Sequence, residues 1–341
     1  MQLRFGIIGC GRIAPRHADP LVGIENAKLV AVCDIIESRA KSFSEKYGTK
    51  KFSNYLDVIS SPDIDVVNIC TPSGLHAQMA IEALNAGKHV IVEKPMALNP
   101  VDADKMIQAS KATGRKLCVV LQNRYNPPMQ DLYNLIRSKQ IGAVLLGSVT
   151  VRWYRPQEYY EDGWHGTKAM DGGALMNQSI HHIDALQWLI GEPVESVVAY
   201  TGTMVHKMES EDVGIALLKF RGGTLATVEG STITYPQNLE ASVALFGEKG
   251  SVKVGGTALN RKVFWKVKDQ LEHEQELLTH ESIDPPTVYG ESHKHVIKDM
   301  LDAIAADRQP LTNGEEGKKS VVIVSAMYES AGSGQPVCIG S

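Results

Sequence analysis

The sequence predicts an α/β protein in two parts: a doubly wound parallel sheet, followed by an α+β domain with a large, open, mostly antiparallel sheet. Two observations predict this class. Up to about residue 122, short apolar runs alternate with helical patterns, as in a parallel sheet covered on both faces. From about residue 144, strand-like runs are separated by Gly or Pro turns rather than by long helices. We therefore expect residues 1–122 and 123–341 to form the two domains.

The first part can be interpreted element by element. The charged or amphipathic segments 36–47, 76–85 and 101–113 are typical of helices. Pro62 marks a turn before one strand, and Gly87 suits the left-handed end of the helix before another. Strands are expected where short apolar runs occur, at 5–8, 29–32, 66–70, 89–93 and 117–121.

The second part begins with strands and ends with helices. The helices are expected over 292–306, which should return toward the first domain, and over 315–330. The expected strands, which have turn residues between them, are 144–154, 194–201, 214–220, 224–230 and 240–246.

A glycine turn joins the first strand to the first helix, in the sequence GCGRIA over residues 9–14. Gly9 permits the tight turn, Gly11 lets the backbone approach a pyrophosphate, and the helix N-terminus faces the phosphates. Asp34, at the end of the next strand, can accept hydrogen bonds from ribose hydroxyls and would repel a 2′-phosphate. The pattern predicts a Rossmann domain that binds NAD. The expected cofactor contacts here are Gly9, Gly11, Arg12, Ile13 and Asp34.

Composition excludes several classes of protein. A net charge of −4 and a pI of about 6.3 give no basic surface for nucleic acid. No apolar stretch is long enough to span a membrane, and the N-terminus runs directly into a strand, which leaves no room for a signal peptide. We therefore expect a cytoplasmic protein. The five cysteines form no CxxC pair, which favours free thiols and disfavours a thiol-based metal site.

Three polar segments follow strands of the first part, at the edge of the sheet where ligands bind. Lys94, in Glu93-Lys94-Pro95, could stabilise an alkoxide beside the nicotinamide, or could be an exposed lysine paired with Glu93. The segments 71–76 and 122–127 could line the cofactor. Alternatively, the first could be a structural turn in which His76 caps or packs, and the second could be a hinge turn. The expected cofactor contacts at this edge are Thr71, Pro72, His76, Glu93, Lys94, Gln122 and Asn123.

A further constellation lies in the segment GGALMNQSIHHID, residues 172–184. At helical spacing Asn177, His181 and Asp184 share one face, which could orient a histidine as a general base. The alternative is an Asn cap followed by surface histidines. His-His-x-x-Asp could also hold a metal, but no second ligand cluster supports that, and no metal is expected.

In combination, GCGRIA, TPSGLH, EKP, QNRYNP and GGALMNQSIHHID resemble the glucose–fructose oxidoreductase/inositol dehydrogenase (Gfo/Idh/MocA) family over nearly the whole chain. The resemblance implies that Lys94 and His181 are catalytic, that His182 is a non-catalytic neighbour, and that the Lys94–Pro95 peptide is cis. It also implies a homodimer or homotetramer, because the open sheet face of family members is usually buried between subunits.

Segments 152–160, 163–167 and 171–178 are similar to those of UDP-N-acetylglucosaminuronate 3-dehydrogenases within the family. This implies oxidation of the C3 hydroxyl of a UDP-N-acetylhexosaminuronate to the 3-keto sugar. The arginines could instead belong to a solvated strand face. A dehydrogenase of a free polyol or hexose, and a non-catalytic cofactor-bound sensor, are the alternative functions. The expected substrate contacts are Lys94, Arg152, Arg155, Trp164, Thr167, Asn177 and His181.

Overall fold

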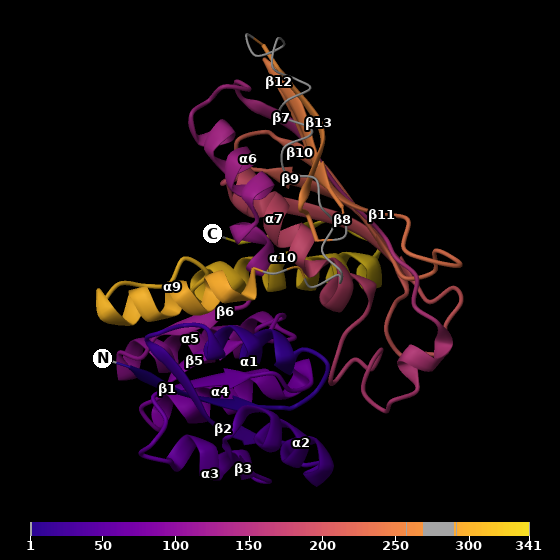
Figure 1. The fold of residues 1–341 in the computed structure, drawn as a ribbon. Coiled ribbons are helices and arrows are strands. Elements are labelled where there is room, and N and C mark those ends of the chain that lie inside the picture. The colour runs from indigo at the N-terminus through magenta and orange to yellow at the C-terminus, as the bar shows by residue number, and fades with distance from the viewer. Residues whose placement is uncertain (1, 257, 269–289, 291, 341) are drawn as a thin grey trace. The chain divides into compact units, whose positions relative to one another are not determined.

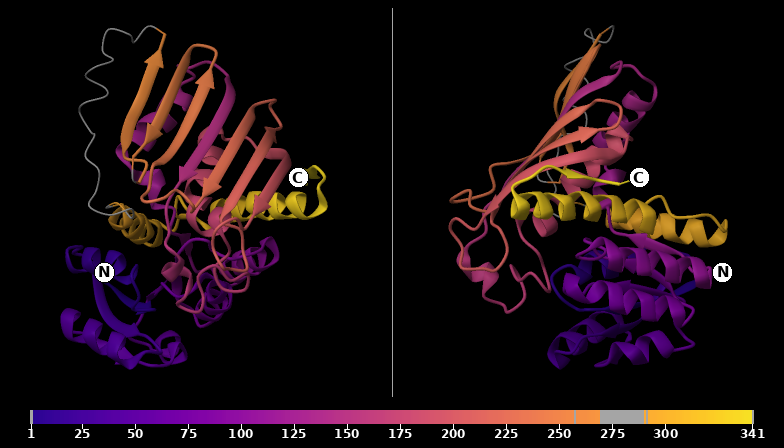
Figure 2. Two further views of the ribbon diagram at one scale, coloured as in Figure 1. Left: turned by 90° about the vertical axis from the view of Figure 1, so that its right-hand side faces the viewer. Right: turned by 180° about the vertical axis from the view of Figure 1, so that it is seen from behind.

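The computed structural model describes residues 2–256, 258–268, 290 and 292–340 (Figures 1 and 2). The chain divides into two compact units: Met1–Gln122 with Glu291–Lys318, and Asn123–Gly290 with Lys319–Ser341. The expected α/β class is confirmed, with one sheet in each unit. Among the described residues, no helix is both long and apolar enough to cross a membrane.

The first unit contains a six-stranded parallel sheet in the order β3-β2-β1-β4-β5-β6 (Figure 1). The direction of strand succession changes between β1 and β4, and ligands of doubly wound sheets bind at the carboxyl ends near such a point. The short β3 and α3 were not expected from the sequence, because β3 carries two lysines and has little apolar character. The strands are β1 (Leu3–Ile8), β2 (Ala27–Cys33), β3 (Lys50–Phe52), β4 (Val66–Ile69), β5 (His89–Val92) and β6 (Leu117–Val119).

Local sequence signals set the ends of the helices in this unit. Before α5, the Asn99 side chain accepts a hydrogen bond from the Asp102 backbone N–H at 2.9 Å, and Gly114 ends the helix with a left-handed φ of 67°. The helices are α1 (Ala14–Val22), α2 (Glu37–Tyr47), α3 (Tyr55–Ser60), α4 (His76–Asn85), α5 (Pro100–Thr113) and α9 (His293–Ala305).

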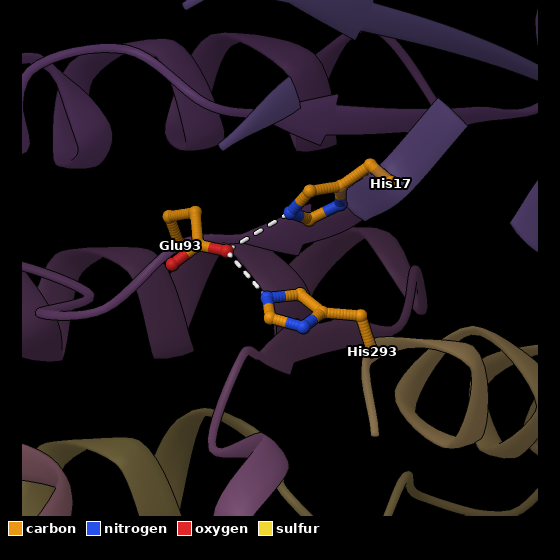
Figure 3. A group of neighbouring side chains, drawn as sticks. All are labelled: His17, Glu93 and His293. Carbon is orange, nitrogen blue, oxygen red and sulfur yellow. Dashed lines mark hydrogen bonds and ion pairs between the residues drawn. The ribbon is translucent and has the colours of Figure 1, made fainter. Parts of the chain in front are cut away.

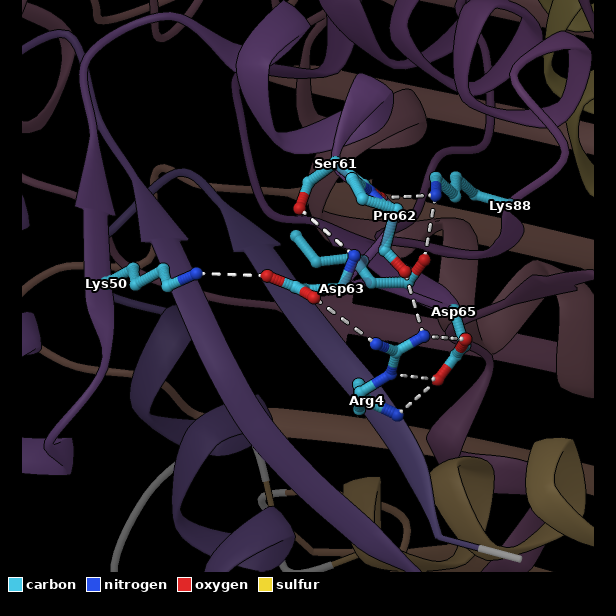
Figure 4. A network of polar contacts seen from close by, with 8 residues as sticks. Arg4, Lys50, Ser61, Pro62, Asp63, Asp65 and Lys88 are labelled. Carbon is cyan, nitrogen blue, oxygen red and sulfur yellow. Dashed lines mark hydrogen bonds and ion pairs between the residues drawn. The ribbon is translucent and has the colours of Figure 1, made fainter.

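Charged side chains tie together the amino ends of the strands, at the edge away from the carboxyl ends (Figure 4). The Arg4 guanidinium donates to both carboxylate oxygens of Asp65, at 3.0 and 2.9 Å. The Lys88 ammonium is buried and donates to the carbonyl oxygens of Ser61 at 2.6 Å and Ile64 at 2.8 Å. These bonds hold the chain leading into β4 against β1 and the start of β5.

The second unit contains an eight-stranded sheet in the order β13-β12-β11-β7-β10-β9-β8-β14, in which β7 and β10 run parallel and the other described neighbours antiparallel (Figure 2). The expected strands are present, and β12, β13 and β14 are additional. The strands are β7 (Val144–Arg152), β8 (Val194–Gly202), β9 (Val213–Phe220), β10 (Leu225–Ser231), β11 (Glu240–Gly247), β12 (Gly250–Gly255), β13 (Arg261–Val267) and β14 (Val337–Cys338).

Helices cover one face of this sheet: α6 (Pro127–Arg137), the π-helix η4 (Ala174–Ser179) and α7 (Ile180–Ile190). Along β7, Val149 and Val151 are buried toward the helices, and a Cβ on Gly147 would touch Leu186 of α7. The alternate residues of β7 therefore point to the opposite, open face. Helix α10 (Gly314–Ser333) begins in the first unit and continues in the second.

Candidate active site

The glycine turn after β1 fits a dinucleotide. Gly9 has a φ of +93°, and a Cβ there would lie 2.6 Å from the Cys70 carbonyl oxygen, so the fold requires glycine. Apart from its chain neighbours, a Cβ on Gly11 would meet no atom of the described residues within 4 Å, so their packing does not explain that glycine. The space beside it at the start of α1 suits the close approach of a pyrophosphate.

Asp34 is fixed beside this turn. Its Oδ2 accepts the backbone N–H of Cys10 at 2.8 Å, and its Oδ1 accepts that of Ile36 at 2.8 Å. Each carboxylate oxygen retains a second acceptor position for a ribose hydroxyl. The residues present therefore fit NAD, and the negative charge at the end of β2 disfavours a 2′-phosphate.

The loops that follow β4 and β5 are joined by His76. Its Nδ1 lies 2.7 Å from the Pro95 carbonyl oxygen and its Nε2 lies 2.9 Å from that of Thr71, and the side chain is buried. Both ring nitrogens face the protein backbone, and a cofactor contact of His76 stays a prediction. The half-buried Lys94 is held in the loop that His76 fixes, and the Lys94–Pro95 peptide is cis, as expected.

Glu93 has partners that the sequence did not reveal. Its carboxylate contacts two buried histidines, His17 from α1 at 2.9 Å and His293 from α9 at 3.5 Å (Figure 3). The expected alternative, an ion pair between Glu93 and the Lys94 side chain, is not among the ion pairs of the described residues. Gln122 and Asn123 are buried just after β6, on either side of the division between the units.

In the second unit, η4 is seated on glycines. Gly214 of β9 and Gly230 of β10 are direct cross-strand partners. A Cβ on Gly214 would lie 2.6 Å from Leu175, and one on Gly230 would collide with Ser179. The buried π-helix can approach the sheet here because the two strands carry no side chains at this point. π-Helical turns inside longer helices are frequent at functional sites.

The residues before and within η4 are held by two buried carboxylates. Asn177 donates to Asp171, whose other oxygen accepts the Gly166 N–H at 2.7 Å. Glu211 accepts the backbone N–H of Leu175 at 2.8 Å and the hydroxyl of Tyr328 at 3.0 Å. Burial raises the pKa of Glu211 to about 7.

The two adjacent histidines of α7 differ in their surroundings. His181 is half-buried, whereas His182 is buried and meets Trp153 edge-to-face at 5.8 Å between ring centroids. Neither ring nitrogen of His182 has a hydrogen-bond partner among the described residues, and burial lowers its pKa to about 3. His182 is therefore a neutral core side chain, while His181 is partly exposed.

The expected common face of Asn177, His181 and Asp184 requires a correction. Residues 174–179 are π-helical, so the regular helical spacing does not extend back to Asn177. Asp184 is buried, and its two oxygens accept from Arg124 at 2.8 and 2.6 Å. That carboxylate is thus engaged by a buried guanidinium from a segment 60 residues away.

The two candidate arginines lie in different surroundings. Arg152 points to the open face of the sheet, opposite α7, and pairs with Glu229 at 2.6 Å and Glu240 at 3.4 Å. Its assignment as a substrate contact stays a prediction, and these ion pairs favour the strand-face alternative. Arg155 donates to Gln178 of η4 at 2.7 Å and lies over the Trp153 ring at 5.0 Å.

The remaining candidate contacts lie in one loop of the second unit. Trp164 and Thr167 are half-buried, and the Thr167 hydroxyl donates to the Trp164 carbonyl oxygen at 2.7 Å. The ring of Trp164 also contacts that of His165 in a tilted arrangement, with 3.6 Å between centroids. This loop presents an aromatic surface held by its own hydrogen bonds.

Comparison with known proteins identifies the family. Residues 3–121 match the sequence model described as "Oxidoreductase family, NAD-binding Rossmann fold", and residues 134–339 match "Oxidoreductase family, C-terminal alpha/beta domain". The chain belongs to the Gfo/Idh/MocA family. It is an NAD-dependent oxidoreductase acting on CH–OH groups: the glycine turn and Asp34 predicted the cofactor, and the family resemblance implied the reaction.

Two kinds of relative are similar over most of the chain. The WlbA dehydrogenase from Bordetella pertussis, solved in complex with NADH and UDP-GlcNAcA, is 38% identical, with a TM-score of 0.93 over 100% of this chain and 98% of that one. A WlbA dehydrogenase from Chromobacterium violaceum with the same ligands is 39% identical, with a TM-score of 0.91 over 99% and 96%. The myo-inositol 2-dehydrogenase of Thermotoga maritima is 27% identical over 96% of each chain.

Proposed function

We propose that this protein oxidises the C3 hydroxyl of a UDP-N-acetylhexosaminuronate to the 3-keto sugar, with NAD⁺ as the hydride acceptor. The observation that carries the proposal is the 38–39% identity, over nearly the whole chain, to two dehydrogenases solved with NADH and UDP-GlcNAcA. The inositol dehydrogenases are similar at lower identity, 27% for the example from Thermotoga maritima.

We assign the proton chemistry to Lys94 and His181. The Lys94 ammonium would hydrogen-bond the reacting hydroxyl and stabilise the alkoxide as it forms. The His181 imidazole would accept the hydroxyl proton, because an ordinary histidine is largely unprotonated at neutral pH and can act as a base. Bound NAD⁺ would supply the acceptor for the hydride of the carbon that bears this hydroxyl. One proton and one hydride thus leave the carbinol, which becomes a ketone.

His182 and Asp184 receive no part in this proton transfer. The low pKa of His182 keeps it neutral in the core, and the Asp184 carboxylate is bonded to Arg124. Asn177 carries no charge that would hold His181 in its protonated form. Its bond to Asp171 fixes the π-helical turn that precedes His181.

The anionic substrate is assigned to the loop of the second unit that carries Arg155, Trp164 and Thr167. Arg155 supplies a cation beside aromatic rings, and guanidinium groups bind carboxylates and phosphates by paired hydrogen bonds. Trp164 offers a surface for stacking. Arg152 is left out, because its glutamate partners on the open face already balance its charge.

The decisive assay is NADH formation, followed by absorbance, with UDP-GlcNAcA, UDP-GlcNAc, myo-inositol and glucose as substrates. If UDP-GlcNAcA is the one substrate oxidised, the proposal is supported. A preference for myo-inositol would instead indicate a polyol dehydrogenase, the activity for which the inositol dehydrogenases are named. UDP-GlcNAc tests the carboxylate, because it has the same nucleotide and lacks only that charge.

The catalytic assignments are tested with matched variants. Lys94→Ala should lower kcat by roughly 10²–10³ and His181→Ala by roughly 10²–10⁴. His182→Ala is the control for His181 and should retain turnover. In the wild type, kcat/KM should fall at acid pH as a base is protonated. In His181→Ala, kcat/KM should no longer show this decrease at acid pH. Wild-type turnover in the His181 variant would assign the proton to another group.

We also propose that the protein is a homodimer or homotetramer assembled through the open face of the eight-stranded sheet. Large apolar side chains are exposed there: Tyr200 on β8, Ile215 and Leu217 on β9, and Leu225 on β10. Exposed apolar surface of this kind commonly marks a protein interface. Light scattering should give a mass above that of one chain, and Leu217→Glu should reduce it. A wild-type monomer would contradict the proposal.

A further inference from the structure

A buried carboxylate lies just after β5, and no lysine or arginine of the described residues forms an ion pair with it. Glu93 is 6% exposed, and its ion-pair partners among the described residues are two histidines, His17 and His293 (Figure 3). The remaining bond comes from the backbone N–H of Lys94, at 3.2 Å from Oε2. The three side chains come from the loop just after β5, from α1 and from α9, all within the first unit.

A chain of hydrogen bonds links the members of this cluster. The Asn68 amide lies 3.0 Å from His17 Nδ1, and His17 Nε2 faces Glu93 Oε1 at 2.9 Å. Glu93 is an ionised acceptor in this chain. Burial opposes ionisation of Glu93, but the hydrogen bond from His17 and the contact with His293 hold its pKa well below the ordinary value.

His293 does not cancel this charge, because burial lowers its pKa and favours the neutral ring. The field of Glu93 also reaches the end of the neighbouring strand. Burial is the largest cause of the raised pKa of the Cys70 thiol, just after β4, and the negative charge of Glu93 is the second largest. The carboxyl ends of β4 and β5 thus lie in the field of a buried anion, and cofactors of this fold bind at that edge.

We propose that Glu93 is an electrostatic determinant of the bound cofactor's oxidation state, favouring NAD⁺ over NADH. The nicotinamide ring is cationic in NAD⁺ and neutral in NADH, so a fixed negative charge near it stabilises the oxidised form selectively. The inference rests on NAD binding and is independent of which sugar is oxidised. It predicts that Glu93 lowers the reduction potential of the bound couple.

The test measures dissociation constants of NAD⁺ by calorimetry and of NADH by fluorescence, without a sugar substrate. Glu93→Gln should raise the ratio Kd(NAD⁺)/Kd(NADH) by about tenfold, the scale of one charge acting through a partly screened interior. That ratio corresponds to about 30 mV for a two-electron couple. Glu93→Asp, which keeps the charge, should leave the ratio near the wild-type value.

Two further variants control the measurement. Glu82→Gln removes a solvent-accessible carboxylate on α4 of the same unit and should not change the ratio. His293→Lys leaves Glu93 in place and pairs it with a permanent cation. It should raise the ratio as Glu93→Gln does, and so serves as the test if the glutamine variant does not fold.

Three outcomes would overturn the proposal. An equal loss of affinity for NAD⁺ and NADH in Glu93→Gln would mean a structural role. An unchanged ratio would mean that the histidines neutralise Glu93. A stoichiometric divalent metal in the purified wild type, lost in the variant, would mean that the cluster is a cation site. Failure to oxidise UDP-GlcNAcA would refute the proposed substrate without changing these ratios.

Discussion

Glu211→Gln should change how the stability of the second unit depends on pH. The carboxyl group is 7% exposed, and its burial raises the pKa from 4.5 to about 7. Between these pH values the folded state holds a proton that the unfolded state has released. A raised carboxyl pKa therefore stabilises the folded state at low pH, and this contribution is lost as pH rises from about 4.5 to 7.

The size of the effect follows from the shift. A difference of about 2.5 pKa units corresponds to ~3 kcal/mol of unfolding free energy lost between pH 4.5 and pH 8. Glutamine keeps an oxygen that can accept from the Leu175 N–H and the Tyr328 hydroxyl, but it does not titrate. The variant should therefore be more stable than the wild type at pH 8, by up to ~3 kcal/mol.

Tryptophan fluorescence during urea unfolding measures this directly, because all four tryptophans lie in the second unit. The quantity to compare is the unfolding free energy of the variant minus that of the wild type, at pH 5 and at pH 8. The contributions of the other titrating groups cancel in this difference. Glu158→Gln, at an exposed position, is the control and should follow the wild type. A difference that does not change between pH 5 and pH 8 would refute the reasoning, because ionisation of Glu211 would then cost nothing.

Three other perturbations follow from single side chains. Burial lowers the pKa of His182 from 6.5 to about 3, so the unfolding free energy of the wild type should fall by ~3 kcal/mol between pH 7 and pH 4. In the same fluorescence assay, the unfolding free energy of His182→Phe should fall by less over this pH range. Asp34→Ser should lower the ratio of kcat/KM with NAD to kcat/KM with NADP by about tenfold, because it removes a charge that repels the 2′-phosphate. An unchanged ratio would mean that other residues discriminate between the two cofactors. Lys88→Met should lower the unfolding free energy of the first unit by ~1–3 kcal/mol, since it removes the ammonium that donates to the carbonyl oxygens of Ser61 and Ile64; thermal unfolding measures this loss, and an unchanged midpoint would show that the two bonds do not stabilise the unit.

The sequence by itself determined the features that depend on neighbouring residues. The glycine turn and the acidic residue ending β2 predicted the NAD site, because the turn, the strand and the helix that build it are contiguous in the chain. Strand and helix patterns predicted the fold class for the same reason, since apolar periodicity is a local property. Choosing His181 over His182 remains a prediction from the sequence, and their difference in burial supports it.

Only the tertiary structure decided which side chains meet across the chain. Arg124 and Asp184 are 60 positions apart, and no local pattern announces that the arginine engages the carboxylate expected beside His181. Strand alternation shows that Arg152 and Val151 point to opposite faces, but the packing of α7 determines which face is open.

The cluster of His17, Glu93 and His293 likewise joins an early helix to a late one. In the sequence, His17 and His293 belong to two helices far apart in the chain and Glu93 to a loop after a strand, and no local pattern relates the three. The proposed influence of Glu93 depends on the low dielectric of the interior and on its two histidine partners, and both exist only in the folded unit.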